Sequence, residues 1–320
     1  MDRNRTRIAA FGLAAAAALG VASAATQLPI RAMRWVAPGA PVALVLSQKP
    51  SECLSPPATP EAAYLVEVGR AAFNTPLVLG GQASRAGLEC DSCHRGGRTN
   101  PQFFFLGVSG KPGTVDVTTS LFSSHRGDGI DNPKPIPDLS GPRGRLKISR
   151  NPQSPELRTF IHGLVTQEFD GAEPPPAVLD GLAAYVRGLR PEACPVNALQ
   201  PITLQSVMGD AVRAAKAAGA ALAHKDGPTA ILMLSSARTQ LGLVNERYAA
   251  PSLAPERAAL GAADLDLASI QDGIRAGRPD MAARVAVWTA QASALTKRLA
   301  QHQDRSLFNP VRLAAAVSQP

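Results

Sequence analysis

The chain has 320 residues, of which 45% are hydrophobic and 18% charged, a globular composition long enough for two domains with real cores. Alanine is abundant and aromatic residues make up only 4%, so we expect an all-α fold. The formal net charge is +8, but the basic residues are scattered, which excludes a nucleic-acid-binding patch.

The first 25 residues are typical of a secretory signal peptide. Three arginines among the first seven residues precede an apolar run, 8–21, and residues 22–24 form an A-x-A cleavage site. The alternative is an uncleaved membrane anchor, but the run is mostly alanine and barely long enough to span a bilayer. No later segment is predicted to cross a membrane. We therefore expect export to the periplasm, and a mature chain that is not an integral membrane protein.

A linker bearing proline and serine is predicted for residues 26–58. A helix then begins with Thr59 as its N-cap and Pro60 at the first helical position. Residues 95–150 carry many glycines and prolines and show no helical period. A long irregular stretch of this kind inside a compact region is usually functional.

Two more helices are predicted before Cys194. The second runs from Pro176 to Leu189 and is closed by Pro191. The first begins at the cap residue Ser154 and has a single apolar face, formed by Leu157, Phe160, Ile161, Leu164 and Val165. Residues 59–195 are therefore assigned to one domain.

Beyond Cys194 the apolar residues step by three and four through four helical stretches. We predict a four-helix bundle over residues 200–305, followed by a tail, 306–320. The last stretch has the clearest stripe, formed by Met281, Val285, Trp288, Ala292, Leu295 and Leu299. The methionine and tryptophan stripes are expected in the core and not as cofactor ligands.

The motif C-x-x-C-H is formed by Cys90, Cys93 and His94. A zinc site normally needs two cysteine pairs, but the two other cysteines stand alone. A thioredoxin-like redox pair should follow a buried strand in a βαβ pattern, and none surrounds Cys90. The motif is typical of haem attachment, in which both sulfurs form thioethers with haem and the histidine binds its iron. We therefore predict one covalent haem c.

The surrounding residues resemble bacterial cytochrome c peroxidase-type domains. Those domains open with a helix ending in Gly-Arg-x-x-Phe, a polar turn and C-x-x-C-H, and here the stretch reads "VGRAAFNTPLVLGGQASRAGLECDSCHRGG". The closing helices of these domains and of class I cytochromes c resemble "LRTFIHGLVTQEF" and "LDGLAAYVRGLRP". The resemblance covers about residues 60–191. It implies crossed terminal helices, with Gly69 and Phe73 against Tyr185 and Leu189.

The chain departs from that family because the peroxidases carry two haems on two motifs, and this chain has one motif. Class I cytochromes usually complete the iron with a methionine, but no methionine lies between Met33 and Met208. His125, in a loop after two apolar residues, is the predicted sixth ligand. An open site, His162 on the side of its helix, and a methionine from the bundle are the alternatives.

Other residues are candidates for the walls and edges of a haem pocket. Phe103, Phe104 and Phe105 are expected to line it, with one of the three exposed or in contact with a partner. Crossed helices would also bring Cys53 and Cys194 together, and an oxidising compartment favours a disulfide between them. Four basic residues are candidates to pair with haem propionates, although solvated side chains are an equal alternative: Arg126, Arg143, Arg145 and Lys147.

The sequence therefore predicts an exported monohaem c-type cytochrome that transfers single electrons to a redox partner protein. A mildly basic surface would suit an acidic partner, although a solvated surface is the simpler explanation. One alternative is a one-haem peroxidase-like oxidoreductase acting on hydrogen peroxide, with His125 as proton acceptor and Arg126 stabilising the leaving oxygen. Another is a haem-bearing structural or sensor subunit that acts through the helical bundle.

Overall fold

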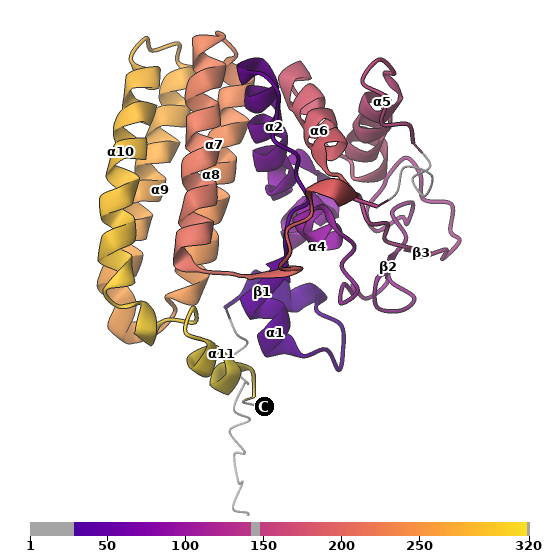
Figure 1. The fold of residues 1–320 in the computed structure, drawn as a ribbon, viewed down its shortest axis with the longest axis horizontal. Coiled ribbons are helices and arrows are strands. Elements are labelled where there is room, and N and C mark those ends of the chain that lie inside the picture. Colours follow the sequence, from indigo (N-terminus) through magenta and orange to yellow (C-terminus); the bar gives the residue numbers. More distant parts are fainter. Residues whose placement is uncertain (1–28, 142–147, 319–320) are drawn as a thin grey trace, which may run out of the picture.

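The computed structural model describes residues 29–141 and 148–318. Within these ranges the chain is mostly helical, as the composition predicts, and its strands form two short antiparallel pairs. The expected signal segment, 1–25, lies outside the described residues, as do Arg143, Arg145 and Lys147. Figure 1 shows four long helices on one side of the molecule and shorter elements with long loops on the other.

The chain order of the elements is the following. The helices are α1 (Val42–Ser47), α2 (Pro60–Phe73), α3 (Gly81–Ala86), α4 (Cys90–Cys93), α5 (Glu156–Gly163), α6 (Pro176–Gly188), α7 (Leu204–Ala223), α8 (Gly227–Arg247), α9 (Ala254–Arg275), α10 (Met281–Ala300) and α11 (Pro310–Val317). The strand pairs are β1 (Gln48–Pro50) with β4 (Leu199–Pro201), and β2 (Thr114–Val115) with β3 (Lys134–Pro135).

Helix α2 begins as the sequence predicts. The Thr59 side chain accepts a hydrogen bond from the Ala62 amide at 3.1 Å, and Pro60 occupies the first turn, where its missing N–H costs nothing. The start of α5 differs, because Pro155 and not Ser154 is its N-cap. The Ser154 hydroxyl still accepts from the Glu156 amide at 3.2 Å, so it stabilises the same turn from one position earlier.

The predicted apolar face of α5 is only partly buried. Leu157 and Val165 are buried, but the Phe160 side chain is 44% exposed. The helix packs mainly on α6 and runs into a π-helical turn, Leu164–Glu168, so only a narrow stripe of it faces the interior. The expectation that all five residues form one apolar face toward the interior was therefore wrong at Phe160.

Helices α2 and α6 cross at two glycines. A Cβ atom on Gly69 would lie 1.9 Å from the Gly181 carbonyl oxygen, so the two backbones are in direct contact. One turn further on, the rings of Phe73 and Tyr185 lie 5.1 Å apart, centroid to centroid. The crossing and the Phe73–Tyr185 contact agree with the expectation, whereas Gly69 faces Gly181 and not the aromatic residue.

Helices α7, α8, α9 and α10 pack in sequence order, and α10 returns against α7. Buried alanines on α7 allow close approach, because a small side chain keeps two helix axes near each other. The stripe predicted for α10 is buried at Met281, Val285, Trp288, Ala292 and Leu299. Methionines of these helices therefore belong to the core, as expected.

A single hydrophobic core joins the two regions that the sequence divides at residue 195. It includes buried side chains from α2, α6 and all four long helices. Helix α2 packs on both α7 and α8, and the Ser236 hydroxyl donates to the Ala71 carbonyl at 2.8 Å. The expected linker, 26–58, holds α1 and β1, and the expected tail holds α11, which packs on α1.

Candidate functional site

The motif C-x-x-C-H occupies one helical turn. Cys90 and Cys93 are the two ends of α4, and the His94 amide donates to the Cys90 carbonyl at 2.9 Å, closing the turn. The Asn100 side chain donates to the Ser92 carbonyl at 2.8 Å and its amide to the Cys93 carbonyl at 3.0 Å. Both thiols are free. The turn therefore presents two unpaired thiols and an imidazole from one rigid segment.

Two glycines directly after the motif allow the chain to leave this turn. Gly96 and Gly97 have φ values of 61° and 72°, in the left-handed region that favours glycine. A Cβ atom would lie 2.5 Å from the Pro50 carbonyl oxygen at Gly96, and 2.6 Å from Leu189 Cδ1 at Gly97. The residues "HRGGR" therefore fix the motif against β1 and the end of α6.

The His94 side chain is held in one tautomer. Its Nδ1–H donates to the Pro137 carbonyl at 3.0 Å, because a carbonyl can only accept. Burial lowers the pKa of His94 to about 4, so the ring is neutral near pH 7. Among the described residues, Nε2 has no hydrogen-bond partner. A neutral imidazole fixed through Nδ1 presents the Nε2 lone pair, which is the arrangement that a metal-binding histidine requires.

The Pro137 carbonyl is positioned by a network of loop hydrogen bonds. The Ile136 amide donates to the Gly113 carbonyl at 3.0 Å, and the Thr99 hydroxyl donates to the Ile136 carbonyl at 2.8 Å. The Leu139 amide donates to the Gly97 carbonyl at 3.1 Å. The irregular segment is therefore tied to the motif at both sides of Pro137.

The two thiols lie between two apolar clusters. Cys90 packs against the main core, and Cys93 against a smaller cluster that includes Phe103 and Phe122. Burial raises the pKa of Cys90 to about 12 and that of Cys93 further, so both are neutral thiols. A thioether carries no charge and suits such an environment. The donor set, two thiols and a neutral imidazole, fits covalent haem.

The exposure of the three adjacent phenylalanines differs from the expectation. Phe103 is fully buried, while Phe104 and Phe105 are partly buried, so none of the three is exposed. The residue that takes the solvent-facing position is Leu106, one step further along. The Phe105 ring instead lies 5.7 Å from the Phe122 ring, centroid to centroid and tilted by 56°, in the cluster beside Cys93.

His125 and Arg126 lie on a turn tied to the loop after α5. The His125 side chain is 62% exposed, with Nε2 3.9 Å from Asp170 Oδ1. Arg126 donates to Gln167 Oε1 at 2.7 Å. His162, the alternative nitrogen ligand, lies 2.7 Å from Glu173. His125, Arg126 and His162 thus each lie close to a polar side chain: Asp170, Gln167 and Glu173. The role of His125 as the sixth iron ligand stays a prediction.

Cys53 and Cys194 form a disulfide with an S–S distance of 2.06 Å. It closes the base of the region that contains α2 to α6, beside the β1–β4 pair and the bridge between Leu54 and Leu189. Arg98 contacts both sulfurs, with Nη1 at 3.5 Å from Cys53 Sγ and 3.9 Å from Cys194 Sγ.

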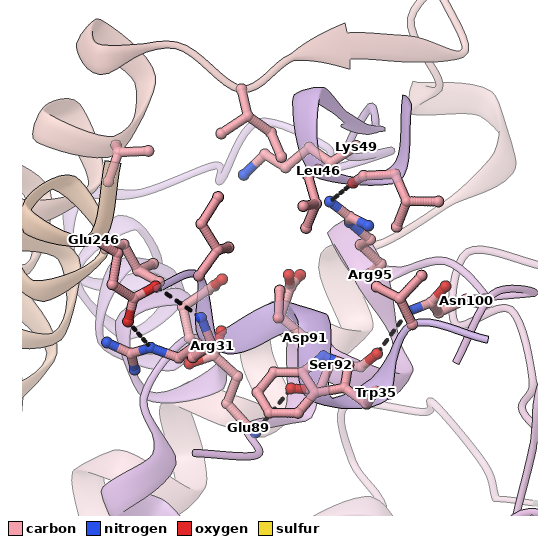
Figure 2. Close-up of a pocket in the computed structure, with 18 of the residues that line it drawn as sticks. Arg31, Trp35, Leu46, Lys49, Glu89, Asp91, Ser92, Arg95, Asn100 and Glu246 are labelled. Atoms are coloured by element: carbon pink, nitrogen blue, oxygen red, sulfur yellow. Dashed lines mark hydrogen bonds and ion pairs between the residues drawn. The ribbon is translucent and has the colours of Figure 1, made fainter. Parts of the chain in front are cut away.

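A cavity of about 140 Å³ is lined by Glu89, Asp91 and Ser92 together with polar and apolar residues of other segments, but by neither Cys90, Cys93 nor His94. Figure 2 shows Asp91 pointing from α4 into this space, with Lys49 across it and the Arg31–Glu246 ion pair at one side. Burial, and then the charge of Asp91, raises the pKa of Glu89 to about 8. Its Oε2 atom is buried without a hydrogen-bond partner.

Comparison with protein-family models, with curated proteins and with solved structures found no match to this chain. Among the described residues, none of the helices combines the length and the apolar character that a membrane crossing requires. The functional assignment therefore depends on the geometry of the motif and its surroundings.

Sequence reasoning missed three residues of the site: Arg98, Pro137 and Asp138. Pro137 is one of three prolines in "NPKPIPD", and nothing local distinguishes the one whose carbonyl meets His94. Its position depends on the β2–β3 pairing, which joins segments about twenty residues apart. Arg98 carried a weak signal, because it follows the motif closely in a loop with several charged residues.

Proposed function

We propose that this chain is a monohaem c-type cytochrome that transfers single electrons. The observation that carries the proposal is the His94 imidazole, which is neutral and fixed by Pro137 beside the two free thiols of α4. Haem bound here would accept and release one electron at its iron. Cys90 and Cys93 would hold it by thioethers, and His94 would bind iron through Nε2.

The protein residues have separate tasks in this function. Pro137 makes His94 a stronger ligand, because donation from Nδ1–H increases electron density on Nε2. Phe103, Phe122 and their neighbours keep water from the cluster beside Cys93, and a low dielectric environment is one of the determinants of a haem potential. The glycines after the motif let the chain pack closely against β1 and the end of α6, which fixes the turn that carries the three residues.

Electron transfer is favoured over peroxide chemistry by the state of the proposed catalytic pair. His125 is largely exposed and Arg126 is held by Gln167. Peroxide cleavage needs both side chains aimed at a bound oxygen in a site that excludes water. The proposal includes export to the periplasm and a redox partner protein, both of which are expectations from the sequence.

Extraction of haem into acidified acetone tests the proposal. The wild-type protein should keep its haem on the polypeptide, and Cys90→Ser with Cys93→Ser should release it. The matched control is Cys53→Ser with Cys194→Ser, which removes as many sulfurs elsewhere and should leave the haem attached. Haem that is extractable from the wild type, or a purified protein with none, would disprove the function.

A further inference from the structure

The two sulfurs of the disulfide differ in access. Cys53 is fully buried, whereas Cys194 is exposed. Thiol–disulfide exchange proceeds by attack of a thiolate on one sulfur while the other leaves. An external thiolate therefore reaches Cys194 Sγ, and Cys53 Sγ is the leaving group.

Arg98 favours departure of that group. Its Nη1 lies 3.5 Å from Cys53 Sγ, and a positive charge beside a cysteine stabilises its thiolate. A thiol with a lower pKa leaves faster in exchange. The Arg98 guanidinium thus contacts the S–S bond that would break and would stabilise the Cys53 thiolate that forms.

Arg98 also contacts the loop that positions His94. Its Nε donates to Asp138 Oδ2 at 2.7 Å. Although burial opposes it, hydrogen bonds from Ser140 and Arg98 lower the pKa of Asp138, which is therefore ionised. Asp138 directly follows Pro137, whose carbonyl accepts from His94. One side chain thus bridges the disulfide and the backbone acceptor of the proximal histidine.

We propose that the Cys53–Cys194 disulfide is a redox-active site for an external dithiol, and that Arg98 transmits its state to His94. One thiolate of the dithiol attacks Cys194 Sγ, and the electron pair of the S–S bond leaves on Cys53. The second thiol then attacks the mixed disulfide and releases Cys194. The proton of the second thiol passes to Cys194, Cys53 remains a thiolate beside Arg98, and the dithiol becomes a disulfide. The two cysteines thus take up two electrons and one proton in total.

Reduction alters the partners of Arg98. The Cys53 thiolate competes with Asp138 for the guanidinium, which loosens the hold on the segment that carries the Pro137 carbonyl. A weaker hydrogen bond from His94 Nδ1–H makes the imidazole a poorer donor, so ferric iron is stabilised less. The haem reduction potential therefore rises when the disulfide opens. This coupling rests on the proposed function, whereas the reactivity of the disulfide does not.

Equilibrium redox titrations of the haem-loaded protein test the coupling. Wild-type protein whose disulfide has been reduced with dithiothreitol should show a higher haem potential than the oxidised protein, whereas Cys53→Ser with Cys194→Ser, which cannot form the thiolate, should not respond to the same treatment. In Arg98→Leu, reduction of the disulfide should cause no shift, because the transmitting side chain is absent. The matched control is Arg158→Leu, which removes a pair of similar geometry, Arg158 Nε to Asp180 Oδ1 at 2.7 Å, and should leave the response to the disulfide intact.

Alkylation after treatment with dithiothreitol tests the reactivity of the disulfide without using the haem. In the native wild-type protein Cys194 should become labelled, Cys53 should become labelled when the treated chain is then unfolded in a second alkylating reagent, and Arg98→Leu should be reduced more slowly. If the serine variants do not fold, Arg98→Leu alone serves as the reference that does not respond to reduction. A disulfide that resists the dithiol until the chain unfolds, or equal shifts with and without Arg98, would overturn the proposal.

Discussion

The close crossing of α2 and α6 at Gly69 leaves no room for a methyl group, so Gly69→Ala should destabilise the fold. In Gly69→Ala, the new Cβ would lie 1.9 Å from the Gly181 carbonyl oxygen, 2.2 Å from its carbon and 2.8 Å from the Leu182 amide nitrogen. All three are backbone atoms, so no rotamer change can relieve the contact. The helices would have to separate by roughly 1.6 Å to reach ordinary contact at ~3.5 Å.

Two effects of opposite sign decide how far Gly69→Ala changes the free energy of unfolding. Alanine is favoured over glycine inside a helix by ~1 kcal/mol. Overpacking of a tight core typically costs ~1–3 kcal/mol, and a backbone clash falls at or above the upper end. We expect a net loss of about 2 kcal/mol in the free energy of unfolding. The separation would also move Phe73, whose ring lies 6.5 Å from that of His94.

Urea unfolding followed by circular dichroism measures this loss as a lower midpoint with an unchanged slope. The control is Gly261→Ala on α9, where a Cβ atom would meet nothing within 4 Å. That variant should be more stable than the wild type by up to ~1 kcal/mol, because only helix propensity changes. If Gly69→Ala and Gly261→Ala were stabilised alike, the close crossing would be refuted.

Three further predictions follow from the site. The unfolded chain releases the Glu89 proton near its ordinary pKa of 4.5, but the folded chain holds it to about 8, so the wild type should lose stability relative to Glu89→Gln as the pH rises through this window. At ~1.4 kcal/mol per pKa unit, this stability difference between the wild type and Glu89→Gln reaches a few kcal/mol and is constant above pH 8. Urea titrations at pH 4.5 and 8.5 measure it, with the exposed Glu61→Gln as control. The same difference at both pH values would contradict the prediction. If His125 binds the iron, the ferric absorption spectrum of the wild type is low-spin and His125→Ala converts it to high-spin while His162→Ala does not; a high-spin wild type that reacts rapidly with hydrogen peroxide would instead favour the peroxidase alternative. Replacing Cys53 and Cys194 by serine removes a link across 141 residues and should lower the free energy of unfolding by roughly 2–4 kcal/mol in calorimetry, a result that unchanged thermal midpoints would exclude.

Local signals were sufficient for α2, α6 and the four long helices. They were insufficient for α1 and α11, which lie in the expected linker and tail, and for the contacts between distant segments. Thr59 and Pro60 specify the start of α2 through chemistry within one turn, and the sequence predicts it correctly. The stripe of α10 is likewise a property of consecutive residues. The packing of α2 on α7 and α8 depends instead on alanines far along the chain that leave room for it, and no pattern within either segment records this.

In the C-x-x-C-H site, too, local sequence predicts some residues and contacts between distant segments determine the others. Its three residues identify themselves by spacing, whereas the acceptor of His94 is supplied by Pro137, forty-three positions away. That contact requires the β2–β3 pairing and the two glycines after the motif together. The disulfide could be inferred because only two cysteines were left over, but its contact with Arg98 could not.

Because both halves of the chain contribute to one core, a single proteolytic cut should not separate them. Val196 is fully exposed in the segment between the disulfide and β4, so a protease can cut there without disturbing a helix. The two fragments would stay associated, because α2 remains packed between α6 and the long helices α7 and α8, and β1 remains paired with β4. A nicked protein would therefore elute as an intact particle, and neither fragment would be a self-sufficient module for expression.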